Sequence, residues 1–522
     1  MTMPLLTTLA LSLAALQWSK LVLSIIFVFA FGGICGSFIN VIVYRLPLGQ
    51  SIVRPPSACP KCSTKLSWRD NIPVFGWIVL RGRCRYCKAP ISGEYPIVEF
   101  IVATLFTLTF FLWFADAQTL MSIGFDPTPW RPEWALGGLQ RTWPIAILFA
   151  ALFFSLVTIT LIDAKTFHIP LVIPWMLAGF ALIAHPVSAL WMGSNGALRR
   201  SPHEWVIPVA NWPWIGLALG AGVGLAISIL LLRFGLLPRS FADYEAWEKA
   251  NTPEQTDAPA SGAETGGESD ISPSAPGNAL LRALFFSGPI IAGMFTGLAF
   301  GLRSGSVGAY VAIGAGVGML VGLLLRRLVP DGERHESDPV WIHYPHARRE
   351  MCKEALFLVI PIALAIAGYY IALTAVGPWT PNHQTGTILP SAGPPPLWLS
   401  ALGGSLLGLI VGGGLVWAVR IGASLAFGKE AMGLGDVHLM AGVGAVLGWI
   451  DPTLAFFMAP FFGIAWVIGA QAMSMMNKDG SRAPTALPYG PHLAMATIFV
   501  VLAKPVLETG LSLIMSRTID LP

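Results

Sequence analysis

Residues 144–162 read PIAILFAALFFSLVTITLI, and the next residue is Asp163. An uncharged run of this length is about what a helix needs to cross a bilayer core of ~30 Å. The carboxyl group of Asp163 therefore stands where an apolar run meets a polar loop. Asp436 has a similar position, because it follows Gly433-Leu434-Gly435 and opens the apolar run 437–450. Ionisable groups at this depth are candidates for function.

The composition of the whole chain is that of a membrane protein. Its 522 residues are 54% hydrophobic and only 11% charged, with a mean hydropathy of +0.66, whereas soluble domains are about 25% charged. The apolar runs predict an all-α polytopic membrane protein with about twelve transmembrane helices. The expected spans are 21–44, 96–114, 144–162, 169–185, 213–237, 283–302, 307–325, 355–376, 397–418, 437–450, 453–474 and 492–513.

The charges of the loops predict the orientation of these spans. The loop 45–90 holds nine Lys and Arg residues and a single acid, Asp70, so the positive-inside rule places it in the cytoplasm. Counting spans from this loop brings Asp163 and Asp436 to the same cytoplasmic face. The net charge of +4 then reflects orientation and contact with membrane lipids, and no basic stripe with interleaved aromatics suggests nucleic-acid binding.

Four cysteines in the same loop have the spacing of a metal site. Cys59 and Cys62 form one C-x2-C pair, and Cys84 and Cys87 form another. Two such pairs can hold one structural Zn²⁺ through four thiolates. Two disulfides or four free thiols are the alternatives, and disulfides are disfavoured in a reducing cytoplasm.

The order of these features divides the chain into segments. Residues 251–278 are rich in Pro, Gly, Ser, Glu and Ala and hold no aromatic residue, so we expect a disordered cytoplasmic linker. The predicted segments are a lead-in 1–20, a first helix 21–44, a cytoplasmic zinc-knuckle domain 45–95, membrane helices 96–185, an inserted membrane region 186–396, membrane helices 397–513 and a tail 514–522.

Several motifs together resemble the prepilin peptidases, the leader peptidase/N-methyltransferases of type IV pili and type II secretion. Residues 36–47 read GSFINVIVYRLP and residues 81–99 read RGRCRYCKAPISGEYPIVE, which is similar to the zinc-bearing N-terminal domain of that family. Residues 432–436 (MGLGD) are similar to its G-x-G-D signature, and residues 487–491 (LPYGP) to a later element. The resemblance covers about residues 20–185 and 397–513.

The resemblance implies a GxGD-type intramembrane aspartyl protease of the bacterial inner membrane, with Asp163 and Asp436 as its catalytic pair. The implied partners are prepilin or pseudopilin precursors, which carry a short basic leader, a glycine and an apolar helix. Gly433, Gly435 and His438 are expected to position the substrate or the backbone, and His438 replaces a lysine that is usual in the family. The family also typically has eight spans, so the region 190–396 suggests four additional ones.

A second activity, methyl transfer from S-adenosylmethionine to the new N-terminus, is implied by the resemblance alone. Gly82 and Glu99 match positions that the family associates with its N-terminal domain. A turn glycine and an interfacial salt bridge with an arginine are the simpler interpretations of these two residues. A peptidase without methyltransferase activity, and a non-catalytic scaffold or a proton- or cation-coupled transporter, remain as alternative functions.

Overall fold

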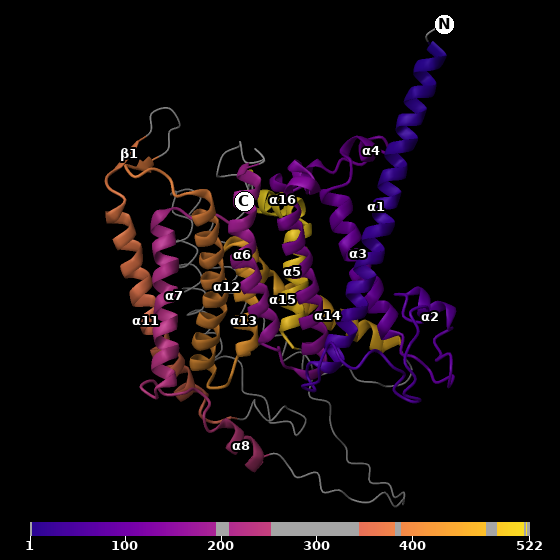
Figure 1. Ribbon diagram of the computed structural model, residues 1–522. Helices are drawn as coiled ribbons and strands as arrows, with labels where there is room; N and C mark the ends of the chain where they lie inside the picture. Colours follow the sequence, from indigo (N-terminus) through magenta and orange to yellow (C-terminus); the bar gives the residue numbers. More distant parts are fainter. Residues whose placement is uncertain are drawn as a thin grey trace, which may run out of the picture. The chain divides into compact units, whose positions relative to one another are not determined.

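The computed structural model describes residues 3–194, 208–251, 344–381, 388–476, 488–515 and 518 (Figure 1). Helices form nearly all of its regular structure, as expected. The helices are α1 (Met3–Arg45), α2 (Phe75–Val79), α3 (Glu94–Trp113), α4 (Ala117–Met121), α5 (Leu139–Thr166), α6 (Val172–Ser194), α7 (Trp212–Arg233), α8 (Tyr244–Asn251), α11 (Ala347–Ala375), α12 (Leu397–Phe427), α13 (Leu434–Leu447), α14 (Ile450–Met476), α15 (Gly490–Leu502) and α16 (Lys504–Met515). Two short strands, β1 (Trp379–Pro381) and β2 (Ile388–Pro390), pair antiparallel.

Eight of the helices in the described ranges are long and apolar enough to cross a membrane. They correspond to the expected spans in α1, α3, α5, α6, α7, α11, α12 and α14. The expected spans 283–302 and 307–325 lie outside the described residues, as does the expected linker beyond Asn251. The chain is thus a multi-pass membrane protein.

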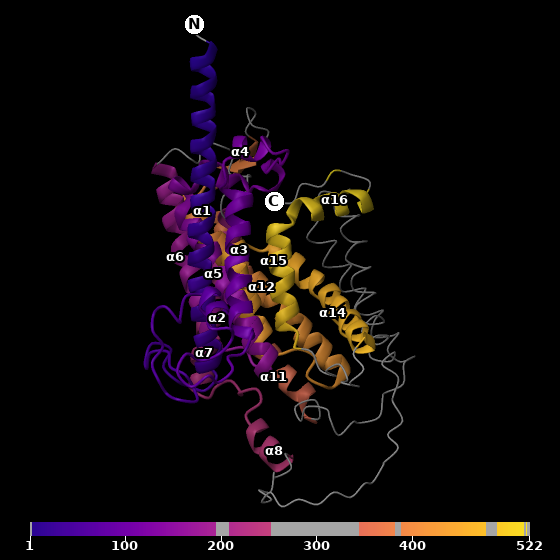
Figure 2. The ribbon, with the colours of Figure 1, turned by 90° about the vertical axis from the view of Figure 1, so that its right-hand side faces the viewer.

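Two of the expected spans differ from the prediction. The run 437–450 becomes α13, which has only 14 residues and ends at Gly448 with a φ of 80°. At ~1.5 Å per residue, α13 reaches about two thirds of the way across a bilayer core. The run 492–513 is not one straight helix, because α15 and α16 meet at a bend of 87°. The views in Figures 1 and 2 show α16 at the end of the bundle opposite to α2.

The N-terminal residues continue the first helix. Residues 1–20 are predicted as a separate lead-in, but α1 runs without a break from Met3 to Arg45. Its later part packs antiparallel against α3, with Gly36 opposite Glu99 and Gly32 opposite Ala103. A Cβ atom at Gly36 would lie 2.6 Å from the Cα of Glu99, so only glycine permits this approach.

Glycines also allow α12 and α13 to cross closely. A Cβ atom at Gly408 of α12 would overlap the carbonyl oxygen of Gly444 and lie 2.7 Å from the Cα of Gly448. A Cβ atom at Gly412 would similarly meet the backbone of Met440. This close crossing sets the position of α13 and therefore of Asp436 in its first turn.

Replacing Gly408 by valine should destabilise the bundle. The added side chain must push two backbones apart, and such overpacking costs about 1–3 kcal/mol of unfolding free energy. Thermal unfolding in detergent measures this effect. Gly414→Val is the matched control, because a Cβ atom there meets nothing within 4 Å. Equal unfolding midpoints for the two variants would show that the crossing does not need glycine.

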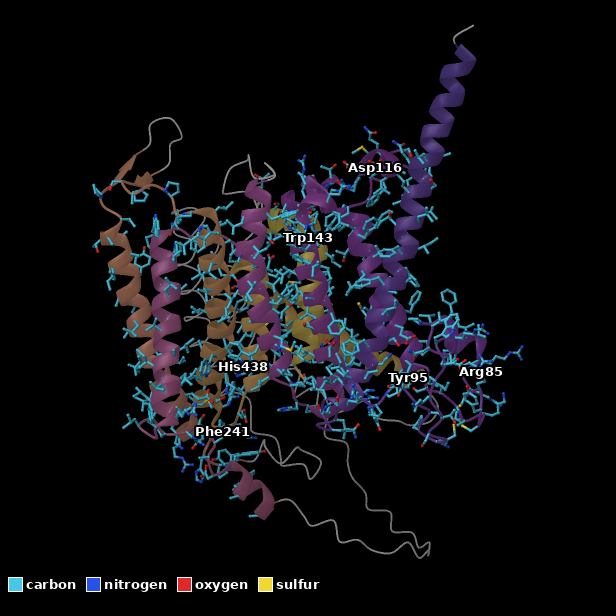
Figure 3. All side chains as sticks on the ribbon, in the orientation of Figure 1. Arg85, Tyr95, Asp116, Trp143, Phe241 and His438 are labelled. Carbon is cyan, nitrogen blue, oxygen red and sulfur yellow. The ribbon has the colours of Figure 1, made fainter. Side chains whose placement is uncertain are left out.

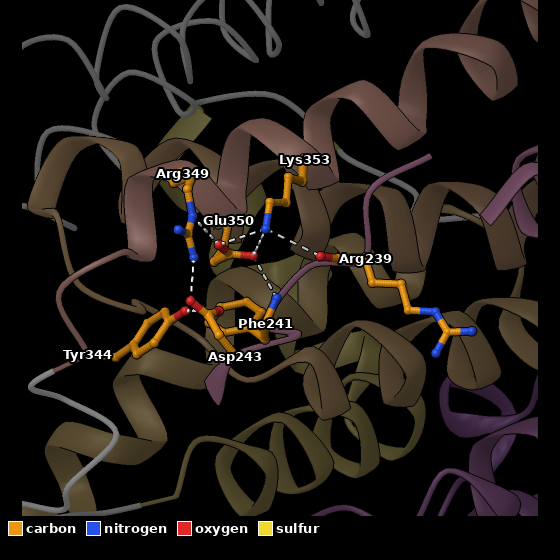
Figure 4. Close-up of polar contacts among 7 residues, drawn as sticks. All are labelled: Arg239, Phe241, Asp243, Tyr344, Arg349, Glu350 and Lys353. Atoms are coloured by element: carbon orange, nitrogen blue, oxygen red, sulfur yellow. Dashed lines mark hydrogen bonds and ion pairs between the residues drawn. The ribbon is translucent and has the colours of Figure 1, made fainter. Parts of the chain in front are cut away.

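The described residues form two compact units. The first comprises 1–238, 355–420 and 432–522, and the second comprises 239–354 and 421–431. In the second unit, Glu350 has a fully buried side chain that binds three donors (Figure 4). The backbone N–H of Phe241 donates to it at 2.6 Å, the guanidinium of Arg349 at 2.7 Å and the ammonium of Lys353 at 3.0 Å.

Asp243 extends this network to the aromatic side chain of Tyr344. The Tyr344 hydroxyl and the Arg349 guanidinium each donate to Asp243 at 2.7 Å. These two donors hold the pKa of the Asp243 carboxyl well below its usual range. The network therefore joins the chain on the two sides of residues 252–343.

Candidate functional site

Asp163 lies in the last turn of α5 and is only 5% exposed. Its carboxylate accepts a hydrogen bond from the backbone N–H of Gly490, the first residue of α15. A Cβ atom at Gly490 would lie 2.5 Å from Oδ2 of Asp163. Glycine at this position therefore lets the backbone amide reach the carboxylate.

Asp436 lies in the first turn of α13 and is 6% exposed. The N-cap residue of this helix is Gly433, whose backbone N–H donates to the Asp436 carboxylate. Gly435 packs against Ile169, and a Cβ atom there would lie 2.9 Å from the Cβ of Ile169. An acid near a helix N-terminus is favoured by the helix dipole.

The structure brings Asp163 and Asp436 together. The charge of Asp163 acts directly on the Asp436 carboxyl, so the two side chains are neighbours. A shared neighbour supports this placement, because Ile169 packs against Gly435 on one side and lies 3.1 Å from the Cβ position of Gly490 on the other. Segments separated by hundreds of residues therefore meet in one buried acidic site, as the sequence predicts.

The acid pair lies at the end of the bundle from which the four-cysteine loop emerges. Lys165, two residues after Asp163, forms an ion pair of 2.7 Å with Glu94, the first residue of α3 and the end of that loop. Figure 3 shows His438 toward the same end as Tyr95, and Asp116 and Trp143 toward the other. The two acids and the cysteine loop therefore lie toward the same end of the bundle.

His438 has a different environment from Asp436. Residues two apart on a helix point to different faces, and the His438 ring packs against Trp175 of α6 with ring centroids 5.6 Å apart. The role predicted for His438 in positioning the substrate stays a prediction. Its contact links α13 to α6.

Arg420 is a site residue that the sequence analysis missed. It is the single charged residue of α12 and is 1% exposed. Its guanidinium donates to the carbonyl oxygen of Met432, which directly precedes Gly433, and its charge interacts with Asp436. The lone arginine in an apolar run was a visible signal, since buried charges usually have a partner of opposite sign.

The four cysteines form a compact cluster that could hold a metal ion. Their sulfur atoms all lie within 4.8 Å of one another, and the Sγ atoms of Cys59 and Cys87 are 3.7 Å apart. Four sulfurs at ~2.3 Å from one Zn²⁺ in a tetrahedron are about 3.8 Å apart. None of the six cysteines forms a disulfide.

The two C-x2-C pairs have the same backbone geometry. In the first, Cys59 N–H donates to Thr64 and Ser63 N–H donates to Cys59. In the second, Cys84 N–H donates to Ala89 and Lys88 N–H donates to Cys84, and Ser63 and Lys88 both have positive φ angles. Two equivalent turns thus present their thiols to one point.

Hydrogen bonds also favour the thiolate form that binds metals. The hydroxyl and the amide of Thr64 lower the pKa of the Cys62 thiol to about 6. The amides of Cys87 and Tyr86 lower the pKa of the Cys84 thiol. Burial and the neighbouring sulfurs raise the pKa of the Cys87 thiol to about 11, so the four thiols do not all ionise together unless a cation offsets their repulsion.

Gly82 and Glu99 have structural partners. Gly82 has a φ of 66° and lies against the Trp77 ring, where a Cβ atom would be 2.8 Å from Cζ2. Glu99 accepts the backbone N–H of Val74 at 2.7 Å and also binds Ser37. The turn-glycine interpretation fits Gly82, whereas Glu99 binds a backbone amide and a hydroxyl in place of the arginine considered from the sequence.

Comparisons with known proteins match both halves of this architecture. The bacterial peptidase A24 N-terminal domain matches residues 30–113, and the type IV leader peptidase family matches residues 386–468. The prepilin leader peptidase/N-methyltransferase of Myxococcus xanthus (strain DK1622) is 52% identical over 81 residues, covering 16% of this chain and 24% of that protein. No solved structure matches.

Two further relatives with the same name cover more of the chain. The protein of Klebsiella pneumoniae is 37% identical over 161 residues, which are 29% of this chain and 59% of that protein. The protein of Aeromonas hydrophila is 34% identical over 164 residues, 27% of this chain and 50% of that protein. The chain thus spans between about a quarter and three fifths of the length of these relatives. The two matches follow one another in the order expected from the sequence motifs, so the chain is similar to prepilin leader peptidases in both its N-terminal and its C-terminal membrane segments.

Proposed function

We propose that this protein is a membrane aspartyl endopeptidase that cleaves the short basic leader from type IV prepilins or pseudopilins. The observation that carries the proposal is the meeting of Asp163 and Asp436 in one buried site at the end of the membrane helices. A leader that joins an apolar helix places its scissile bond at this depth. We place the cysteine loop and both acids on the cytoplasmic side of the bacterial inner membrane, because the loop 45–90 is strongly basic.

The chemistry follows from two carboxyl groups that repel when both are ionised. Such a pair shares one proton, so one member acts as a base and the other as an acid. The base removes a proton from water as its oxygen attacks the scissile carbonyl carbon. The acid then protonates the leaving amide nitrogen as the C–N bond breaks. The Gly490 and Gly433 amides orient the two carboxylates during these steps.

The direct test is a cleavage assay with purified protein in lipid nanodiscs. A prepilin-like precursor with a basic leader should lose that leader at the glycine before its apolar helix, and mass spectrometry identifies the product. A precursor whose leader glycine is replaced by a bulky residue is the control. An intact precursor after long incubation would reject the proposal. A non-catalytic scaffold or transporter predicts that outcome, and it explains neither the paired acids nor the family matches.

Removing Arg420 should impair cleavage through the geometry of the site. In Arg420→Gln, Asp436 loses a nearby positive charge and the Met432 carbonyl loses a charged donor. Loss of a buried charged partner costs about 3–5 kcal/mol, so we expect kcat to fall by at least about tenfold. Arg420→Lys keeps the charge and should retain more activity over the measured pH range. Identical pH profiles for Gln, Lys and parent proteins would rule out this role.

We further propose that the four cysteines hold one structural Zn²⁺, and that the new N-terminus is methylated from S-adenosylmethionine. The first proposal rests on the geometry of the cluster, and the second on the printed names of the relatives. The contacts of Gly82 and Glu99 are with Trp77, Val74 and Ser37, and the role of these two residues in methyl transfer stays a prediction. The mass of the processed N-terminus distinguishes a methylated product from an unmethylated one.

A further inference from the structure

The segment around α2 lies beside the membrane helices and well inside their length. Pro73 packs against α1 at Gly33, where a Cβ atom would be 3.0 Å from the Cβ of Pro73. The pairing of Gly36 with Glu99 and of Gly32 with Ala103 sets Gly33 level with Val102 of α3. Val102 is eight residues into α3, which corresponds to about 12 Å from the start of that helix.

A second contact, made by the next residue, also lies inside the length of α3. The backbone N–H of Val74 donates to Glu99 Oε2 at 2.7 Å, and Glu99 lies in the second turn of α3. Because α3 has 20 residues and is thus about as long as the hydrocarbon core is thick, a bilayer aligned with the two ends of α3 would place Glu99 below the headgroups. The loop that carries the cysteines therefore folds back along α1 and α3 before α2 begins.

The face of α2 that points away from the bundle is apolar. Phe75, Ile78 and Val79 follow the i, i+3, i+4 spacing of one helix face. Their exposed fractions are 59%, 55% and 74%. Ile72, just before α2, is 41% exposed. If α2 lies at the same level in the bilayer as Glu99, these side chains contact acyl chains.

Most backbone N–H groups of this segment have partners within the protein, as contact with lipid favours. In a bilayer, backbone polar groups must find partners within the protein. Gly76 N–H donates to Ile72, Ile78 N–H to Val74 and Leu80 N–H to Gly76. The turn after α2 continues the pattern, with Arg81 N–H bonded to Ile78 and Gly82 N–H to Trp77. The Trp77 indole donates to the Ile91 carbonyl at 3.1 Å.

The charges around α2 suit the headgroup region of an anionic membrane. Arg81 and Arg83 follow α2 directly and are exposed. Asp70, the single acid of the loop 45–90, is neutralised by an ion pair of 2.6 Å with Arg85. The loop thus presents an apolar face flanked by unopposed positive charge, which matches an anionic lipid surface and would repel a basic leader peptide.

We propose that residues 72–79 form a short lipid-embedded segment that anchors the four-cysteine domain in the membrane. The segment does not cross the bilayer, since it enters and returns on the side of the cysteines. Its apolar face contacts acyl chains and Arg81 and Arg83 reach the headgroups. This anchor is independent of the proposed peptidase activity and acts whether or not substrate is present.

Photo-cross-linking in proteoliposomes tests the anchor. The full-length protein, with its metal bound, is reconstituted in vesicles of phosphatidylethanolamine and phosphatidylglycerol. A benzophenone amino acid replaces Val79 in one variant and Phe75 in a second. The control replaces Lys65, an exposed residue of the first C-x2-C turn. After irradiation, mass spectrometry should find at least tenfold more phospholipid adduct at positions 79 and 75 than at position 65.

The alternative occupants of the apolar face give different adducts. Cross-links to a second copy of the chain would identify a protein interface and overturn the proposal. Adducts to an added prepilin, formed in place of lipid adducts, would also overturn it. Equal and low lipid labelling at all three positions would show that the α2 face is in water. Folding of each variant is checked by its thermal unfolding midpoint, and the two test positions give independent readings.

Discussion

Asp163→Asn and Asp436→Asn should each abolish leader removal while the protein still inserts and folds. Asparagine keeps the size of the side chain but cannot exchange a proton at neutral pH, so the shared proton of the pair is lost. Proton transfer by a positioned group contributes roughly 10²–10⁴-fold to a rate. We expect a loss of cleavage rate in this range for each single variant. The rate is measured with a prepilin-like precursor in nanodiscs.

The double variant sharpens this prediction. If the two acids act as one unit, Asp163→Asn combined with Asp436→Asn should cost about as much as either single change, because the losses are not additive. Asp451→Asn is the matched control, since Asp451 is also fully buried in an apolar helix but pairs with Lys504. Full activity in either single catalytic variant would refute the assigned roles. Multiplicative losses would show that the two carboxyls act separately.

Removing one cysteine of the cluster should unfold the domain between α1 and α3. In residues 46–95, the buried side chains of apolar type are those of Cys59 and Cys84 alone. A domain of about this size without a hydrophobic core requires a staple such as a metal ion. Structural Zn²⁺ supplies ~10–16 kcal/mol of binding free energy in small zinc-binding peptides. The metal is therefore expected to be the main stabilising element of this domain.

Cys84→Ser tests this expectation with two readouts. Zinc content by atomic emission should fall from about one ion per chain to near zero, and limited proteolysis should cut the loop between α1 and α3. Cys352→Ser is the control, because Cys352 is exposed and lies outside the cluster. Zinc retained in full by Cys84→Ser, or a protease-resistant loop in its absence, would argue against a four-thiolate site. A chelator applied to the parent protein should reproduce the effect of the substitution.

Much of this fold follows from hydropathy, because long apolar runs have few alternatives in lipid. The run 144–162 lies in α5, as expected, and Asp163 at its end lies close to Asp436, which precedes the run 437–450. The short length of α13 could not be predicted from hydropathy. Residues 437–450 are apolar throughout, and the helix ends early because Gly448 adopts a positive φ that hydropathy does not encode. The bend between α15 and α16 was also missed, since the apolar run continues through it.

The sequence predicts the two acids of the candidate site but not the groups that contact them. Asp163 and Asp436 are visible in the sequence as charges at the borders of apolar runs. The backbone amide of Gly490 leaves no such signature, because any non-proline residue has an N–H, and glycine matters here for the space it leaves. The position of α2 was likewise hidden. The charge of the loop 45–90 predicts its side of the membrane, whereas the contacts of Pro73 and Val74 with α1 and α3 are the basis of the depth that we propose for it.

The central claim is that Asp163 and Asp436 act on one scissile bond. The most direct measurement is an experimental structure with a leader peptide whose scissile amide is replaced by a hydroxyethylene isostere. The hydroxyl of that group stands in for the attacking water. We predict that it hydrogen-bonds to both carboxyls at once, at about 2.5–3.0 Å from an oxygen of each. An inhibitor hydroxyl bound by only one of the two acids, with the other facing away, would contradict the claim.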